Sequence, residues 1–142
     1  MDRFVKPGQR LPRREDHALI TGQSEYTDDL REPGMVHAAM VRSPHAHAVI
    51  EDISTDGAED RPGVIAVFTA EDVDARSVQP LPTAASLPGM KVPDRPMLAG
   101  DRVRYTGEAV AVVLARGPYQ ARDAAERVEV TYEPLDAVVD PE

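Results

Sequence analysis

The chain has 142 residues, which suits one domain, and its 16 Lys and Arg against 25 Asp and Glu give a formal net charge of −9. It contains no cysteine, which excludes disulfides, thiolate zinc sites and cysteine-ligated iron–sulfur clusters. The acidic balance argues against nucleic-acid or membrane binding, and no long apolar run or signal peptide is present, so we expect a cytoplasmic protein.

The first 34 residues are polar and predict an irregular N-terminal arm. Within this arm, residues 15–21 are expected to form one or two helical turns that end at Gly22, because glycine adopts a left-handed conformation at little cost. Pro33-Gly34 marks a turn, after which residues 35–142 are expected to form a single domain.

Two strands are expected next, one over residues 35–41 and one over residues 45–53. Ser43-Pro44 separates them. Because the gap is short, the pattern predicts an antiparallel hairpin.

A short helix is expected over residues 54–59, followed by a buried strand over residues 64–68 and a helical turn over residues 70–73. Residues 76–100 contain five prolines and no periodicity, which predicts a long proline-rich extended loop. A loop of this length within a compact domain is usually functional or held by a partner.

The last stretch predicts a strand over residues 102–105, a bend or bulge at Gly107 and a central strand over residues 109–115. A helix is expected from Pro118, and a half-buried strand over residues 128–133. This strand–helix–strand order indicates an α+β, or mixed α/β, domain built around one mixed sheet.

Three of the four histidines, His37, His45 and His47, lie close together in the sequence and could form a metal site, since imidazole is a common zinc ligand. In the expected hairpin, however, His37 lies about 13 Å or more from His45. We therefore interpret these histidines as structural and assign no metal ligand.

The acidic pairs and the arginines are also explained without a catalytic or binding site. The acidic pairs Glu15-Asp16 and Asp28-Asp29 are expected by chance among 25 acids, and Arg102 and Arg104 are expected to pair with nearby acids, as are Arg13-Arg14. The sequence contains no G-x-S-x-G nucleophile motif and no glycine-rich phosphate loop around Gly107-Glu108. We therefore assign no catalytic, cofactor-binding or metal-binding residue.

The basic residues are almost all arginine, since Lys6 and Lys91 are the only lysines, and aromatic residues make up only 4% of the chain. A GC-rich genome or a high-salt cytoplasm would each explain this bias. Both explanations stay open at the level of sequence.

Several blocks of the chain, in order, resemble the large subunit of molybdenum hydroxylases, the xanthine dehydrogenase and aldehyde oxidase family. The resemblance is strongest to the aerobic carbon monoxide dehydrogenase branch. The blocks are Pro12-Arg13-Arg14-Glu15-Asp16, Leu19-Ile20-Thr21-Gly22, Tyr26-Thr27-Asp28-Asp29, His37-Ala38-Ala39, Val41-Arg42-Ser43-Pro44-His45-Ala46-His47-Ala48, Pro62-Gly63-Val64, Arg102-Val103-Arg104-Tyr105-Thr106-Gly107-Glu108-Ala109-Val110-Ala111 and Val128-Glu129-Val130-Thr131-Tyr132-Glu133-Pro134-Leu135.

The resemblance implies an α/β hammerhead domain, the N-terminal piece of that subunit. In the family, larger domains hold molybdopterin and the active-site glutamate, and electrons pass to iron–sulfur and FAD subunits. This chain ends at Glu142 and carries none of the molybdenum-pocket motifs, so we expect it not to be catalytic by itself.

The resemblance thus implies a structural or assembly component of a molybdopterin-dependent oxidoreductase, either a split small subunit or a truncated piece. Its partners would be the molybdopterin-binding remainder of the large subunit and the iron–sulfur and FAD subunits. In isolation it is expected to self-associate. The alternatives are a stand-alone, non-catalytic protein-interaction module and a small histidine metal protein.

Overall fold

The computed structural model describes residues 8, 13–76, 79–82, 87–93 and 95–140. The chain divides into two compact units, Met1–Pro33 and Gly34–Glu142. Among the residues described, no helix is long and apolar enough to cross a membrane.

The first unit contains a short helix, α1 (Asp16–Ile20), and a single 3-10 turn, η1 (Thr27–Asp29). The expected helical turn is confirmed, and Gly22 follows it with a left-handed φ of 69°. None of the residues described in this unit is buried, so local hydrogen bonds are what hold its two turns.

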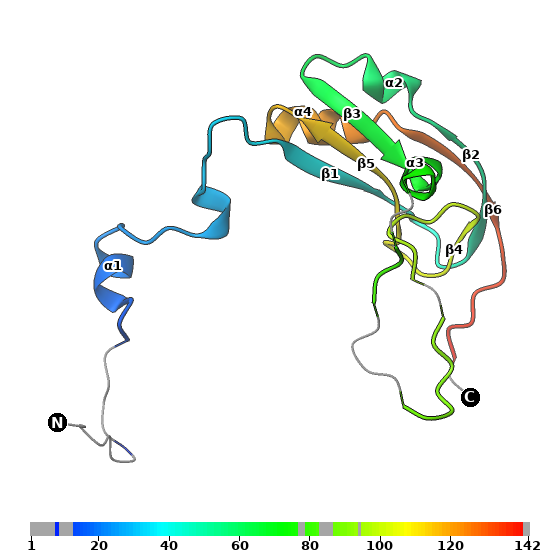
Figure 1. Cartoon of the computed structure of the whole chain (residues 1–142), viewed down its shortest axis with the longest axis horizontal. Coiled ribbons are helices and arrows are strands. Elements are labelled where there is room, and N and C mark those ends of the chain that lie inside the picture. The colour runs from blue at the N-terminus through cyan, green and yellow to red at the C-terminus, as the bar shows by residue number, and fades with distance from the viewer. Residues whose placement is uncertain (1–7, 9–12, 77–78, 83–86, 94, 141–142) are drawn as a thin grey trace. The chain divides into compact units, whose positions relative to one another are not determined.

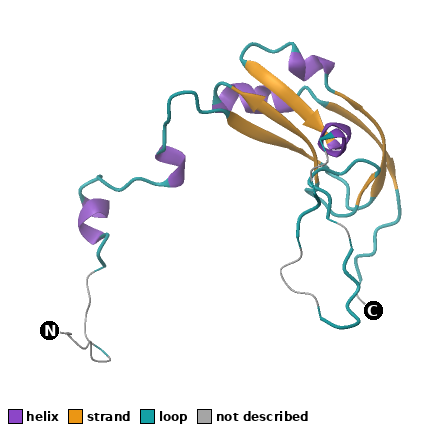
Figure 2. Ribbon diagram, viewed as in Figure 1, coloured by secondary structure: helices purple, strands orange, loops and turns teal. Residues whose placement is uncertain are grey.

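The second unit contains two small antiparallel sheets, with strand orders β1-β5-β3 and β4-β2-β6 in the part of the chain described (Figures 1 and 2). The mixed α/β class is confirmed, but the expectation of one mixed sheet is wrong. The elements are β1 (His37–Arg42), β2 (Ala48–Ser54), α2 (Asp56–Glu59), β3 (Val64–Thr69), α3 (Ala70–Ala75), β4 (Arg102–Val103), β5 (Ala109–Ala115), α4 (Pro118–Ala125) and β6 (Glu129–Pro134).

The expected hairpin of the first two strands is also wrong. Strand β1 pairs with β5, whereas β2 pairs with β4 and β6. The backbone of Ser43, just after β1, is hydrogen-bonded to Gly107 and Glu108. The chain therefore continues beside the start of β5 and crosses to the other sheet instead of folding back on β1.

The strand–helix–strand segment at the end of the chain is confirmed element by element. Helix α4 begins with Pro118, where the missing proline N–H costs no intrahelical bond. The flanking strands nevertheless belong to different sheets, because β1 and β3 occupy both edges of β5 and leave none for β6.

The segment after β3 behaves largely as expected. Helix α3 begins with a capping box, in which the carboxylate of Asp72 accepts hydrogen bonds from the backbone N–H and the hydroxyl of Thr69. The pKa of Asp72 is lowered from its ordinary value, mainly by the hydrogen bond from the backbone N–H of Thr69. Within residues 76–100, those described form no helix or strand, which agrees with the expected loop.

Small side chains fill two adjoining cores. The first lies where α2 and α4 cover the β1-β5-β3 sheet, and the second lies on the β4-β2-β6 sheet. Val41, Ile53 and Val130 pack against both. The buried members of the first core are Ala58, Val67, Ala111, Val113, Ala124 and Val128, and those of the second are Ala48, Ile50, Ala99, Val103 and Val110.

Replacing a buried alanine of α4 by a large residue tests this packing. Ala124 is fully buried, so Ala124→Leu should lower the free energy of unfolding by about 1–3 kcal/mol, because the added atoms have no space. Tyr119→Leu places leucine at an exposed position of the same helix and is the matched control. Urea denaturation should separate the two variants, and equal midpoints would contradict the close packing of α4.

Candidate functional site

A polar junction joins the end of β1 to the start of β5, and we call Ser43, His45, Gly107, Glu108 and Tyr132 the Ser43 junction. The backbone N–H of Ser43 donates to the carbonyl of Glu108 at 2.9 Å, and the N–H of Gly107 donates to the carbonyl of Ser43 at 2.8 Å. Ser43 and Glu108 are the buried polar residues of the chain as described, at 2% and 7% exposure.

The Ser43 hydroxyl organises the turn that leads toward β2. Its oxygen accepts a hydrogen bond from the backbone N–H of His45 at 3.0 Å. The His45 ring packs against Tyr132 of β6, with ring centroids 5.0 Å apart. Burial raises the pKa of Tyr132, and a hydrogen bond with the Ser43 side chain opposes part of that rise. The junction therefore links both sheets.

The loop before β5 is held by the carboxylate of Glu108, which accepts the backbone N–H of Arg104. Gly107 adopts a left-handed φ of 89°, which confirms the expected bend at this residue. The carbonyl of Gly107 accepts a hydrogen bond from the guanidinium of Arg42 at 2.8 Å. Both sides of the junction are thus fixed by hydrogen bonds to backbone groups.

The polar groups of the Ser43 junction are hydrogen-bonded to other groups of the chain. Among the residues described, no buried side-chain nitrogen or oxygen lacks a hydrogen-bond partner. The Glu108 carboxylate accepts a hydrogen bond from a backbone N–H, and the Ser43 hydroxyl is hydrogen-bonded to the backbone N–H and carbonyl of His45. These residues therefore leave no orphaned polar group that would suit a molybdopterin cofactor, and we derive no catalytic step from them.

His37, His45 and His47, which lie close together in the sequence, each contact a different group. His37 begins β1 opposite Ala115, His45 packs on Tyr132, and the Nδ1 atom of His47 lies 2.8 Å from the carbonyl of Asp136. Across the described ranges, no group of three or more His, Cys, Asp or Glu is placed to hold a metal ion.

The acidic pairs act locally. The carboxylate of Asp16 accepts the backbone N–H of Arg13, and that of Asp29 accepts the backbone N–H of Tyr26, both at 3.0 Å.

The expected pairing of Arg102 and Arg104 with a nearby acid is confirmed. Both guanidinium groups contact Asp101, with nitrogen–oxygen distances of 3.5 and 3.2 Å.

The Ser43 junction is the feature that the sequence did not predict. Ser43 and Glu108 lie in two separate blocks, 65 residues apart, and hydropathy carries no information about which blocks pair. The features of the sequence that could have indicated the junction are a serine-proline turn and a glycine-glutamate turn, each beside an apolar strand.

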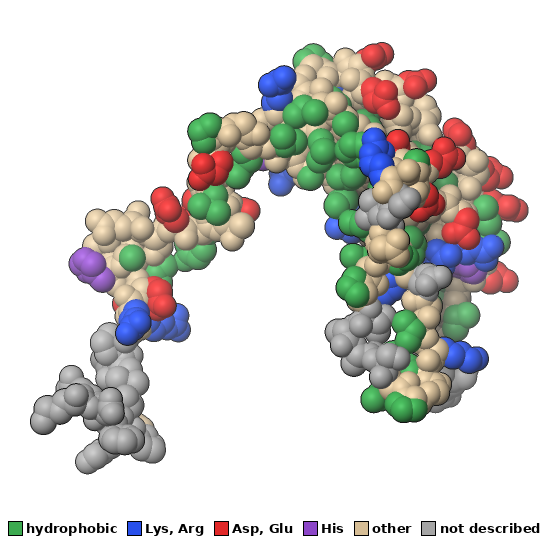
Figure 3. Space-filling model, viewed as in Figure 1, with side chains coloured by type: hydrophobic (Ala, Val, Ile, Leu, Met, Phe, Trp, Pro, Cys, Tyr) green, Lys and Arg blue, Asp and Glu red, His purple; other side chains and the backbone are tan. Residues whose placement is uncertain are grey.

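The surface of the second unit carries both acidic and large hydrophobic side chains. Acidic side chains gather over α2, α3 and the neighbouring strands (Figure 3). Large hydrophobic side chains are also exposed on this unit, at between 43% and 95%. They are Val36, Met40, Ile65, Leu81, Leu87, Met90, Val92, Met97, Tyr105, Tyr119, Val138 and Val139.

Comparison with known families and proteins identifies what the chain is similar to. Residues 21–136 match the aldehyde oxidase and xanthine dehydrogenase a/b hammerhead domain. The chain is 40% identical over 136 residues to the nicotine 6-hydroxylase large subunit of Paenarthrobacter nicotinovorans, which covers 94% of this chain and 16% of that protein. It is 41% identical over 134 residues to the carbon monoxide dehydrogenase large chain of Afipia carboxidovorans, with the same two shares.

Solved structures agree with these relatives. The chain matches a Cu,Mo-CO dehydrogenase with a TM-score of 0.83 and 41% identity, over 94% of this chain and 16% of that one. It matches quinoline 2-oxidoreductase from Pseudomonas putida with the same TM-score and identity, over 92% and 16%. The expected hammerhead fold is confirmed, and the chain spans about a sixth of the length of these relatives.

The half-buried phenol of Tyr132 predicts a loss of stability at alkaline pH. Because the folded pKa is raised, the protonated phenol favours the folded state. Its contribution should be complete below about pH 10, the ordinary tyrosine value, and be lost as the pH rises through the folded value. Urea unfolding across this range should show the decline.

Two variants separate this effect from general alkaline unfolding. Tyr132→Phe should remove that part of the decline, whereas Tyr119→Phe, at an exposed tyrosine, should keep it. The assignment fails if both variants decline alike.

Proposed function

The chain belongs to the aldehyde oxidase and xanthine dehydrogenase a/b hammerhead family, and we propose that it is a structural and assembly component of a molybdopterin-dependent oxidoreductase of the xanthine, aldehyde or carbon monoxide dehydrogenase type. In this proposal residues 35–142 are the hammerhead domain and residues 1–34 an arm. No residue of the chain takes part in catalysis, and the assembly works in the cytoplasm.

One observation carries the proposal: the chain matches about a sixth of each large relative over nearly its own whole length. One matched structure is that of a Cu,Mo-CO dehydrogenase. The described residues, by contrast, offer a polar junction whose buried groups are already bonded. This division supports a role in architecture, with the molybdopterin cofactor held by other sequence.

The exposed hydrophobic side chains support an assembly role as well. Leu87, Tyr119 and Val138 are exposed at 69%, 76% and 95%. Single exposed apolar residues are ordinary, but a protein interface is expected to gather several within reach of one partner. We propose that a molybdopterin-binding protein part covers many of them, with iron–sulfur and FAD subunits in the same complex.

A second candidate function is a stand-alone, non-catalytic protein-interaction module. The same exposed side chains and the long proline-rich loop favour it. The two candidates differ in the partner, because only the first requires a protein that holds molybdenum.

Affinity purification from the source organism tests the first candidate. The tagged 142-residue chain should bring down a molybdenum-containing protein, identified by mass spectrometry together with metal analysis. The Ala124→Leu variant, with a disturbed core, is the matched negative control. Recovery of the wild-type chain without any molybdenum-containing partner would reject the first candidate and leave the second.

The purified chain alone should self-associate, because side chains that a partner would cover are then in contact with water. Sedimentation velocity should show a mean mass that rises with protein concentration, and moderate salt should strengthen the effect by screening the charge of −9. A mass that stays that of one chain at all concentrations would contradict this expectation.

A further inference from the structure

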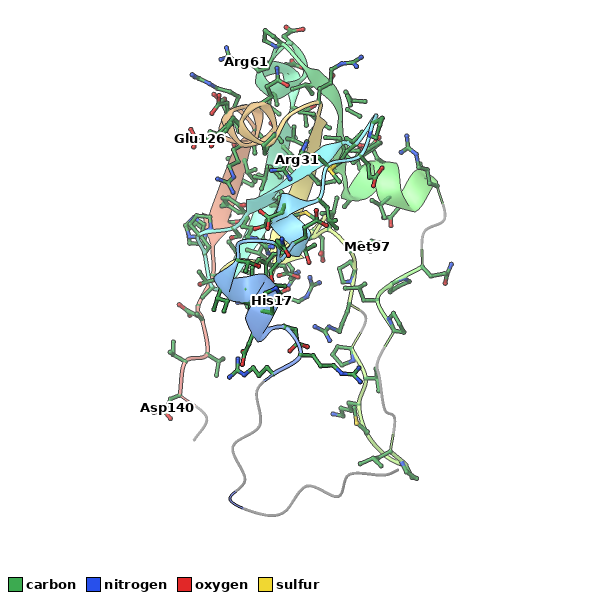
Figure 4. All side chains as sticks on the ribbon, turned by 90° about the vertical axis from the view of Figure 1, so that its left-hand side faces the viewer. His17, Arg31, Arg61, Met97, Glu126 and Asp140 are labelled. Atoms are coloured by element: carbon green, nitrogen blue, oxygen red, sulfur yellow. The ribbon has the colours of Figure 1, made fainter. Side chains whose placement is uncertain are left out.

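The loop between α3 and β4 forms a projection whose base is anchored. We call residues 79–82, 87–93 and 95–97 the finger. At its base Leu98 and Ala99 are buried, and the N–H of Ala99 donates to the carbonyl of Ala109 at 2.8 Å. The N–H of Leu81 donates to the carbonyl of Arg95 at 2.9 Å and joins the two limbs. The residues of the finger extend away from the sheets (Figures 1 and 4).

The finger contains an ordered turn at Leu87-Pro88-Gly89-Met90. Proline in the second position, glycine with a φ of 81° in the third, and a 3.0 Å hydrogen bond from the N–H of Met90 to the carbonyl of Leu87 are the features of a type II turn. The turn presents two large apolar side chains to solvent, since Leu87 is 69% exposed and Met90 46%. A polar turn would satisfy the same backbone geometry, so this choice of residues calls for a partner.

Other parts of the finger share this apolar character. Leu81, Val92 and Met97 are each exposed by more than 40%. Five prolines in residues 76–100 restrict the backbone, so the loop has less conformational freedom to lose on binding. An apolar and partly preorganised projection is suited to insertion into a groove.

Charge indicates the kind of groove. Residues 79–97, the range that includes the finger, carry Lys91 and Arg95 against Asp94, a net charge of +1, so the remaining residues carry −10 to give the total of −9. A complementary surface would have an apolar floor and carboxylates at its rim.

We infer that the finger inserts its Leu87–Met90 turn into an apolar, acid-rimmed groove on the molybdenum-cofactor-binding part of the large subunit. The inference rests on the proposed function. The relatives are about six times longer than the matched segment, so most of the protein surface available to the finger in such an assembly lies outside this chain. A groove on a second copy of the chain is the competing occupant.

Capture of the molybdenum-containing protein by variants of the tagged full chain tests this docking. Leu87→Asp combined with Met90→Asp should reduce capture at least about tenfold, because two side chains lose burial in the groove. The matched control is Gln120→Asp, which adds a negative charge at an exposed polar residue in the first turn of α4, where a negative charge is tolerated. Unchanged circular dichroism should show that both proteins fold.

Each outcome distinguishes the docking from the proposed function. If the double variant and the control capture the molybdenum-containing protein equally, the finger does not dock there, while the proposed function stands. If the wild-type chain captures none, both fall. If the double variant abolishes only self-association and leaves capture intact, the occupant is a second copy and the inference is overturned.

The acidic rim has its own test in Lys91→Glu. At low ionic strength this variant should capture several-fold less of the molybdenum-containing protein than the wild-type chain, and the difference should shrink at about 0.5 M salt because screening weakens charge pairs. Equal or greater capture by Lys91→Glu at low salt would overturn the acidic rim.

Discussion

One strand, β5, is apolar on both faces and hydrogen-bonded along both edges, and the rest of the second unit is arranged around it. Val113 faces the core beneath α4, whereas Val110 belongs to the core of the other sheet. Since β1 and β3 already pair with β5, the strand that follows α4 must find another partner. It pairs with β2, and this is why the domain has two small sheets.

The sequence predicted the elements that depend on a few neighbouring residues better than the contacts between segments far apart in the chain. Local signals placed β5 at residues 109–115 and the start of α4 at Pro118, because continuous apolar character and a helix-starting proline are read within a few residues. The predicted pairing of strands was wrong, because the hydrogen bonds of Ser43 with Gly107 and Glu108 join segments about 65 residues apart. The same long-range contact creates the junction, so the junction escaped prediction too.

The composition of the two cores also fits the proposed role as a structural and assembly component. Many of their buried positions are alanine or valine, which bury little apolar area each. Such cores bring helix and sheet close together, while larger side chains such as Met40, Leu87 and Met97 stay exposed. The chain therefore places much of its large apolar surface where other protein can cover it and keeps its small side chains for itself.

The preference for arginine has a structural basis at particular positions, beyond any effect of genome composition or salt. The guanidinium of Arg42 reaches the carbonyl of Gly107 and helps to hold the turn before β5. That of Arg76 donates to the carbonyl of Asp72 at 2.8 Å and lies 4.9 Å from the centre of the Phe68 ring. A planar group with several donors can bond and stack at once, which the compact ammonium of lysine does less well. At these positions arginine belongs to the fold, whichever influence set the composition of the remaining surface.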